Sequence, residues 1–151
     1  MTLTTSINEV SLCNAPRNCS DQLLKALADR GSVVGASAYN PVIVPRGGEK
    51  GATLDQFLDQ IDHMVKLIGI DHVGFGLDAG EGRSDLEVKI LHSKAKGLGK
   101  APKFRYLEDL TPRRKMKNLT RGLLQRGYSE GDTLKILGGN FLRVFGQIWD
   151  E

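Results

Sequence analysis

The chain of 151 residues has no long hydrophobic run, few aromatic residues and a net charge of only +3. No apolar stretch approaches the roughly 20 residues that cross a bilayer as a helix, so no membrane span is expected. Residues 1–6 contain neither a basic leader nor an apolar core, which predicts a cytoplasmic protein. The length predicts a single domain over residues 1–151, and it is too short for a complete (β/α) barrel of about 250 residues.

Cysteine and histidine are also scarce. Cys13 and Cys19 are the only cysteines and have no histidine nearby, which matches neither a zinc site nor a disulfide framework, so we predict free, buried thiols. The histidines are His63, His72 and His92; as a metal ligand His63 would need a facing histidine or carboxylate that we do not find in the sequence, and His92 has no evident partner. We predict a surface or helix-packing role for His63 and a structural role for His72.

Positive charge is concentrated in the basic region 89–117. It contains ten basic residues against a few acidic ones: Lys89, Lys94, Lys96, Lys100, Lys103, Arg105, Arg113, Arg114, Lys115 and Lys117. Such a stretch binds polyanions in some proteins and is a solvated loop and helix face in many others. Only Phe104 and Tyr106 lie among these charges as stacking platforms, which disfavours a nucleic-acid partner.

Hydrophobic periodicity alternates between strand and helix, which predicts an α/β fold with about three parallel βα units followed by C-terminal helices. The expected elements are a strand at 3–7, a helix at 20–30, a strand at 32–38, a loop at 40–52, a helix at 53–68 and a strand at 69–78. A long excursion at 78–107 follows, with helical character only at 86–91. Thr111 and Pro112 predict the start of another helix, Ser129 caps a short one, 138–140 turns the chain, and 141–148 forms the last helix.

One carboxylate stands at the end of the most strand-like segment. Asp78 follows the β-branched and glycine-rich stretch 69–77. Catalytic groups of (β/α) folds lie at the carboxyl ends of such parallel strands, so Asp78 is a candidate catalytic residue. The alternative is that it caps a turn, as aspartate often does.

Several segments together resemble one family, the metal-dependent membrane (renal) dipeptidases and their bacterial relatives. They are Pro-Arg-Asn at 16–18, the helix 21–31, then 33–35, 53–63, the strand Gly-Ile-Asp-His-Val-Gly-Phe-Gly at 69–76, and the C-terminal stretches 118–129 and 134–145. The resemblance implies a hydrolase with an amidohydrolase-like TIM barrel. In that family two zinc ions activate a hydroxide that attacks the peptide bond of a dipeptide substrate.

Position by position, the resemblance assigns two roles in this chain. Asp78 falls where the family has a carboxylate that passes a proton to the leaving amine. Arg17 falls where the family has an arginine that binds the terminal carboxylate of the substrate, a task that suits its planar fork. The family's metal-binding histidine on the preceding strand falls at Ser6, which is not a zinc ligand, and Glu81 stands near the place of a second family aspartate.

The remaining metal ligands of the family lie upstream of anything in this sequence, so no metal site is predicted within the chain itself. We therefore expect the C-terminal part of a dipeptidase-like barrel, inactive alone. A part of a barrel has open sheet edges, which favours either a homo-oligomer or a complementing N-terminal half. The alternatives are a non-catalytic binding module that uses the region 89–117 for an anionic partner, and a truncated remnant without activity.

Overall fold

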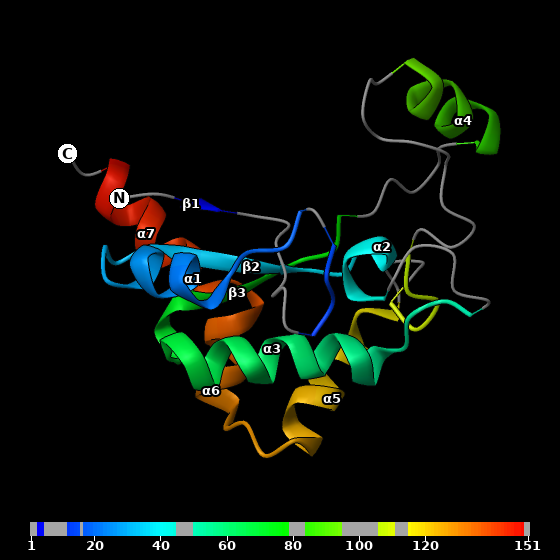
Figure 1. Ribbon diagram of the computed structural model, residues 1–151. Helices are drawn as coiled ribbons and strands as arrows, with labels where there is room; N and C mark the ends of the chain where they lie inside the picture. Colours follow the sequence, from blue (N-terminus) through cyan, green and yellow to red (C-terminus); the bar gives the residue numbers. More distant parts are fainter. Residues whose placement is uncertain are drawn as a thin grey trace.

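The computed structural model of the chain describes residues 3–4, 12–15, 17–44, 50–78, 84–94, 106–110 and 115–149. Its centre is a parallel sheet with the strand order β1-β2-β3, formed by β1 (Leu3–Thr4), β2 (Val33–Ser37) and β3 (Val73–Gly76). Figure 1 shows the strands side by side, with helices packed around them. The predicted α/β fold with parallel strands is confirmed, and the sheet of the described residues is open.

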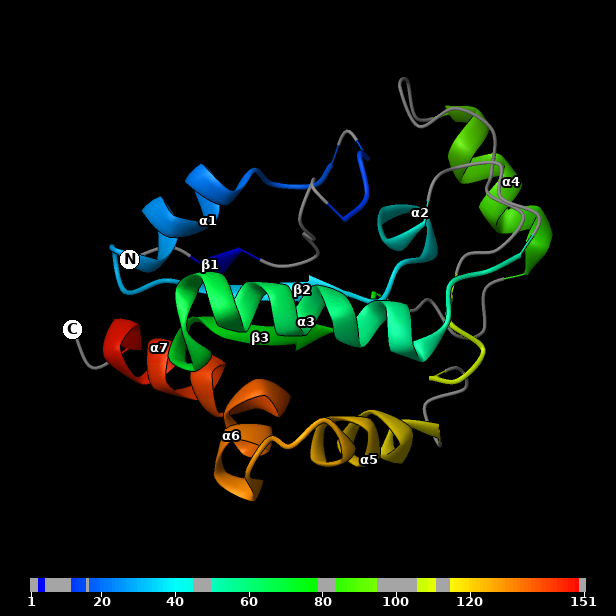
Figure 2. The same cartoon turned by 60° about the horizontal axis from the view of Figure 1, so that its bottom comes forward.

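The helices connect and flank these strands (Figure 2). Their bounds are α1 Asp21–Ala28, α2 Asn40–Ile43, α3 Leu54–Ile68, α4 Asp85–Lys94, α5 Lys117–Gln125, α6 Glu130–Leu134 and α7 Asn140–Trp149. A 3-10 turn at Ile70–His72 precedes β3, and a π-helical turn at Lys135–Gly139 joins α6 to α7. In the described part of the chain, no helix is long and apolar enough to cross a membrane.

Local caps define the ends of the helices, and the cap predicted at Ser129 is present, because its hydroxyl accepts from the Asp132 amide at 3.0 Å. The Ser20 hydroxyl accepts a hydrogen bond from the Leu23 amide at 3.3 Å. Thr53 and Gln56 form a reciprocal capping box at the start of α3. Gly69 ends α3 with a φ of 84°, a conformation that a side chain would disfavour. Because each cap involves residues close in sequence, these helix ends could be predicted without the tertiary structure.

Two predicted boundaries need correction. The segment 40–43 is a helical turn and not loop, because Pro41 occupies the first turn, where its missing amide costs nothing. The strand predicted from residue 69 begins at Val73, after the 3-10 turn. The predicted helix start at Thr111 and Pro112 lies outside the described residues, and α5 itself begins at Lys117. The predicted turn at 138–140 is confirmed, because the backbone of Gly138 is non-helical, with a φ of 157°.

Strand β2 is the centre of the hydrophobic core. All five of its residues are buried, as is typical of a parallel strand whose sequence has no polar alternation. The buried side of α3 packs on the sheet, and its Phe57 ring meets the Phe75 ring edge-on, with ring centroids 6.2 Å apart. This packing fixes the carboxyl ends of β2 and β3 relative to the start of α3.

The amino end of β3 is tied to the C-terminal helices. The Asn140 side-chain amide is buried and donates to the carbonyls of Ile70 and Val73, both at 2.8 Å. Arg143 donates to the Asp71 carbonyl at 2.8 Å, and Lys135 lies 2.8 Å from the Asp71 carboxylate. The hydrogen bond from Lys135 lowers the pKa of Asp71 below its usual value. Helix α7 and the π-helical turn are thereby held against the strand that precedes Asp78.

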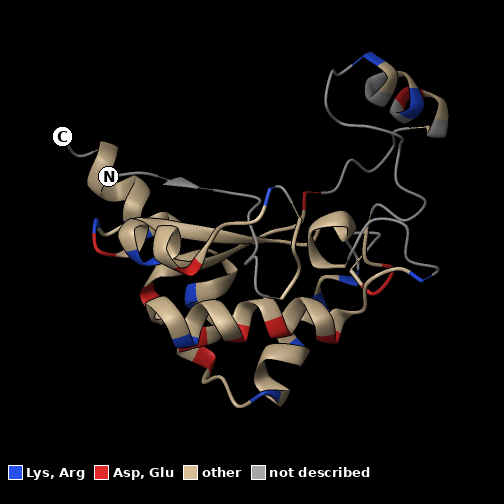
Figure 3. Cartoon of the chain, viewed as in Figure 1, with Lys and Arg blue, Asp and Glu red and all other residues tan. Residues whose placement is uncertain are grey.

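A second tie joins α3 to the segment after α5. The Arg126 guanidinium donates to Asp59 at 2.7 Å, to Asp62, and to the Asp55 carbonyl at 2.9 Å. These carboxylates follow one side of α3 (Figure 3). Burial acts to lower the pKa of Arg126, but the hydrogen bonds to Asp59 and Asp62 outweigh it and raise that pKa. Arg126 therefore remains charged and offsets the repulsion among the carboxylates of Asp55, Asp59 and Asp62.

Gly74 of β3 allows the close approach of α7. A Cβ atom at this position would lie 2.3 Å from Phe141 Cε2, far inside van der Waals contact. We expect Gly74→Ala to lower the free energy of unfolding by about 1–3 kcal/mol, because the Phe141 ring must move out of a packed site. Urea unfolding measures the effect. Gly76→Ala is the matched control, since its nearest atom would be 3.9 Å away, and an equal loss in both variants would contradict this explanation.

Candidate active site

The carboxyl ends of the parallel strands carry the candidate site. In this arrangement, the segment before α1, the residues after β2 and the residues after β3 lie at the same end of the sheet (Figure 1). Asn18 fastens the first of these segments, because its side-chain amide donates to the Cys13 carbonyl at 2.7 Å and to the Val42 carbonyl in α2 at 2.9 Å. The segment that contains Arg17 is thus attached to the helix that follows β2.

Arg17 lies in the turn next to Asn18 and is exposed. None of the acidic side chains in the described ranges forms an ion pair with it. The guanidinium is therefore accessible at the carboxyl end of the sheet. Such a group can bind a carboxylate with two parallel hydrogen bonds.

Asp78 follows β3 at the same end and is also exposed. Its φ of 49° is left-handed, and among the described residues no other non-glycine has a positive φ. This conformation costs free energy for an L residue, although aspartate tolerates it better than most, and such residues cluster at functional sites. In the register of the sheet Ser37 pairs with Gly76, so Asp78 and Tyr39 each stand two residues beyond the last pair.

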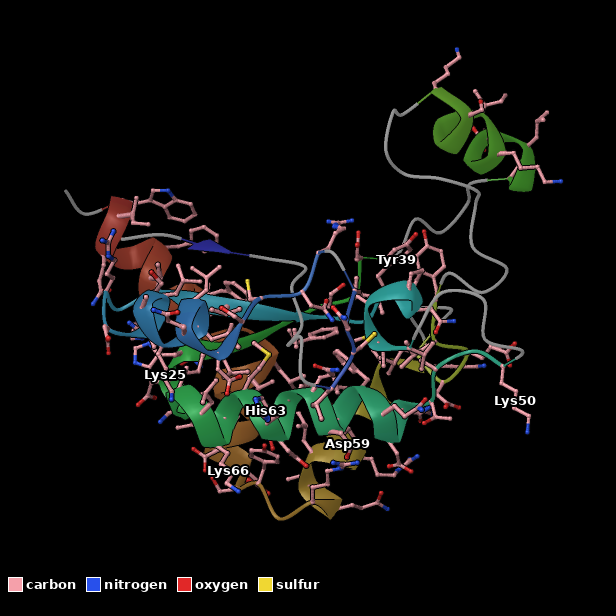
Figure 4. The ribbon with its side chains drawn as sticks, in the orientation of Figure 1. Lys25, Tyr39, Lys50, Asp59, His63 and Lys66 are labelled. Atoms are coloured by element: carbon pink, nitrogen blue, oxygen red, sulfur yellow. The ribbon has the colours of Figure 1, made fainter. Side chains whose placement is uncertain are left out.

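Hydrogen bonds order the chain around these positions. The Ala38 amide donates to the Gly76 carbonyl at 3.0 Å, and the Tyr39 amide donates to the Ser37 hydroxyl at 3.2 Å. Tyr39 forms an isolated antiparallel bridge with Tyr106, and Figure 4 shows it beside α2. The buried Asn40 side chain accepts from the Ala52 amide at 2.7 Å. The strand end is therefore well defined although it is followed by irregular chain.

The sequence interpretation missed Tyr39 and Asn40 as parts of this end of the sheet. A signal was available: a polar residue followed by proline directly after a fully buried strand marks the start of a helical turn. A cavity of about 320 Å³ lies next to this turn, with Lys50, Tyr106, Glu108 and Asp109 in its walls. Neither Arg17 nor Asp78 is among the described residues that line this cavity.

The ligands for a metal centre do not gather in the described part of the chain. No group of three or more histidine, cysteine, aspartate or glutamate side chains there could hold a metal ion. These residues therefore do not fit a zinc centre, and no catalytic step can be derived through one from them. Ser6 and Glu81, which the resemblance compares with family site residues, fall outside the described ranges.

His63 and His72 have structural partners, and the two cysteines are buried. His63 Nε2 lies 3.1 Å from Asp21 Oδ1 and joins α3 to α1, as a helix-packing residue should (Figure 4). His72 Nδ1 lies 2.9 Å from the Ser32 carbonyl oxygen, at the amino end of the sheet. Cys13 and Cys19 are free and buried, as expected, and burial raises the pKa of both thiols.

The basic region 89–117 is described only in part. Lys89 and Lys94 are exposed on α4, which stands away from the sheet in Figure 3. Lys115 is engaged, because its Nζ donates to the Glu108 carbonyl at 2.7 Å. Residues 95–105 and 111–114, which hold most of the remaining charges, lie outside the described ranges. The binding of an anionic partner by this region stays a prediction.

The chain is similar to known proteins over nearly its whole length. The profile of the family described as membrane dipeptidase (peptidase family M19) matches residues 2–150. Dipeptidase aclJ of Aspergillus oryzae is 33% identical over 138 residues, which are 91% of this chain and 28% of that protein. The crystal structure of an amidohydrolase from Pseudomonas aeruginosa is similar with a TM-score of 0.78 and 30% identity, over 97% of this chain and 45% of that chain.

A more distant structure shares the fold. A metallopeptidase from Rhodobacter sphaeroides, solved with a phosphinate mimic of the dipeptide L-Ala-D-Ala, matches with a TM-score of 0.66 and 17% identity, over 91% of this chain and 33% of that chain. The chain thus spans less than half the length of each of these relatives.

Proposed function

This chain belongs to the membrane dipeptidase family, and on that premise we propose that it supplies Arg17 and Asp78 to a site that hydrolyses dipeptides. The observation that carries the proposal is the position of both residues, exposed at the carboxyl end of one parallel sheet. This is the end at which (β/α) enzymes bind and convert their substrates.

Arg17 binds the C-terminal carboxylate of the dipeptide in this proposal. The guanidinium donates two hydrogen bonds to the two carboxylate oxygens and so fixes the position of the substrate along the site. Asn18 supports this role because its two hydrogen bonds hold the turn in which Arg17 lies. In a dipeptide, the free carboxylate lies one residue from the bond that is cut.

Asp78 transfers a proton to the leaving amine. When the peptide C–N bond breaks, the nitrogen must gain a proton to depart as a neutral amine, and a carboxyl group within hydrogen-bond reach can supply it. The left-handed backbone at Asp78 supports this role, because it directs the chain away from β3 directly after the strand.

The zinc ions expected from the resemblance are bound, in this proposal, by residues outside the chain. The family's remaining length holds those ligands, and the chain alone is then inactive. The activity requires the complementing part, which we define as the portion of the P. aeruginosa amidohydrolase that its match to this chain leaves uncovered.

The role of Arg17 can be tested with two matched substrates. For the chain assembled with the complementing part, we expect Arg17→Ala to lower kcat/KM for L-Ala-D-Ala by about 100-fold, equivalent to about 3 kcal/mol, mostly through KM. The same variant should leave hydrolysis of L-Ala-D-Ala amide nearly unchanged, because that substrate has no carboxylate to bind.

Arg30→Ala is the control, since Arg30 is exposed at the other end of α1. An equal loss on both substrates would show that Arg17 acts through the fold and not through the carboxylate. A loss of activity in the control would lead to the same conclusion.

A further inference from the structure

A second cavity lies between α3 and α5, which pack side by side (Figure 2). Its volume is about 390 Å³, and its walls come from the first turn of α3, from Asp109 and from one side of α5. Neither Arg17 nor Asp78 is among the described residues that line it, so the proposed function gives this cavity no role.

One part of the cavity wall is apolar. It consists of Leu54 and the buried Leu58 on α3 and of Gly122 on α5. A Cβ atom at Gly122 would lie 2.7 Å from Leu58 Cδ1, so the missing side chain lets α5 approach α3 closely. This part of the wall offers a ligand hydrophobic contact and no hydrogen-bonding side chain.

Two opposite charges in the same walls have no ion-pair partner. Within the described ranges, neither Arg121 nor Asp109 forms an ion pair, with each other or with another side chain. Asn118 contacts both residues, because its amide donates to the Asp109 carbonyl at 2.8 Å and its side-chain oxygen accepts from Arg121 at 3.4 Å. The other two charged groups in the wall, Arg126 and Asp55, lie 3.5 Å apart and pair with each other. One guanidinium and one carboxylate are therefore available to a ligand.

A guanidinium, a carboxylate and an apolar surface together match the groups of a free α-amino acid. We propose that the cavity between α3 and α5 binds such an amino acid as a zwitterion. The ligand carboxylate accepts hydrogen bonds from Arg121, and the ligand ammonium group donates to the Asp109 carboxylate. The ligand side chain lies against Leu54 and Leu58. An inorganic anion would leave Asp109 without a partner, and a metal cation would be repelled by Arg121.

The test is an NMR titration of the complete, isotope-labelled chain with L-leucine. We expect saturable shifts of the Gly122 backbone amide and the Asn118 side-chain amide. The Kd should be on the order of 1 mM, because exposed charge pairs each contribute little. Arg121→Gln and Asp109→Asn should each weaken this Kd at least fivefold. Arg30→Ala is the control, since Arg30 is exposed and does not line the cavity.

Two matched ligands separate the two charges. L-Leucinamide lacks the carboxylate, so the wild-type chain should bind it at least fivefold more weakly than L-leucine, and Arg121→Gln should bind it about as well as wild type does. N-Acetyl-L-leucine lacks the ammonium group and should show the same relation to Asp109→Asn. Thermal melts of all variants check that the chain remains folded.

Shifts that do not saturate, or L-leucinamide that binds as tightly as L-leucine, would overturn the proposal. Arg17→Ala should leave the Kd for L-leucine unchanged. A Kd that Arg17→Ala weakens and Arg121→Gln does not would assign the amino acid to the candidate active site and would also overturn the proposal. Binding is measured on the chain alone and without hydrolysis, so this proposal and the proposed function fail separately.

Discussion

Replacing Asp78 with asparagine is expected to lower kcat for L-Ala-D-Ala about 100- to 10,000-fold in the chain assembled with the complementing part. The asparagine side chain has the same shape but no acidic proton to give to the leaving amine. It also tolerates the left-handed φ of 49°, so the local backbone is retained. The effect should fall on kcat with little change in KM, because Asp78 acts on the reacting nitrogen and not on substrate binding.

Steady-state kinetics of the purified assembly measure this result. Asp29→Asn serves as the control, because Asp29 is exposed beyond the C-terminus of α1, away from the carboxyl ends of the strands. A kcat within threefold of wild type in Asp78→Asn would exclude proton transfer by this residue. Asp78 would then be a turn residue, as the simpler interpretation of the sequence has it.

The largest effect on stability is expected at Asn140. Asn140→Ala removes both hydrogen bonds to the carbonyls of Ile70 and Val73; the Ile70 carbonyl keeps the Val73 amide as a donor, but the buried Val73 carbonyl loses its partner beneath α7. The cost of unsatisfied buried polar groups predicts a loss of about 2–4 kcal/mol in the free energy of unfolding. These hydrogen bonds hold the amino end of β3. Without them we expect β3, the strand that leads to Asp78, to be more accessible to solvent.

Guanidinium unfolding followed by circular dichroism gives the difference. Asn118→Ala is the matched control, since the Asn118 amide donates to the Asp109 carbonyl at 2.8 Å in an exposed position. Its loss should stay below about 1 kcal/mol. If Asn140→Ala were no more costly than the control, the tie between α7 and β3 would not contribute to stability.

Local chemistry explains which parts of the fold were predictable. The caps at Ser20 and at Thr53 with Gln56 each involve residues three positions apart, so the sequence contains them in full. The parallel order of the strands followed from the alternation of strand and helix. The short helix at 40–43 was missed because proline and the glycine-rich stretch after it are typical of loops. In the structure, Pro41 lies in the first turn of this helix.

Contacts distant in sequence were not predictable. Asn140 donates to carbonyls 67 and 70 residues earlier, and Arg126 donates to carboxylates 64 and 67 residues earlier. No local sequence pattern predicts these partners. Arg17 and Asp78 could be assigned to one end of the sheet, because parallel strands bring their carboxyl ends together. The residues that complete the site could not be identified, since the described chain does not bring metal ligands together.

The most direct test is a crystal structure of the chain, assembled with the complementing part, in complex with the phosphinate mimic of L-Ala-D-Ala. The proposal predicts the Arg17 guanidinium at hydrogen-bond distance, about 2.7–3.2 Å, from the terminal carboxylate of the mimic. It predicts the Asp78 carboxyl group within the same reach of the group that replaces the scissile bond. A mimic bound with either side chain directed away from it would contradict the assignment of these residues to a dipeptidase site.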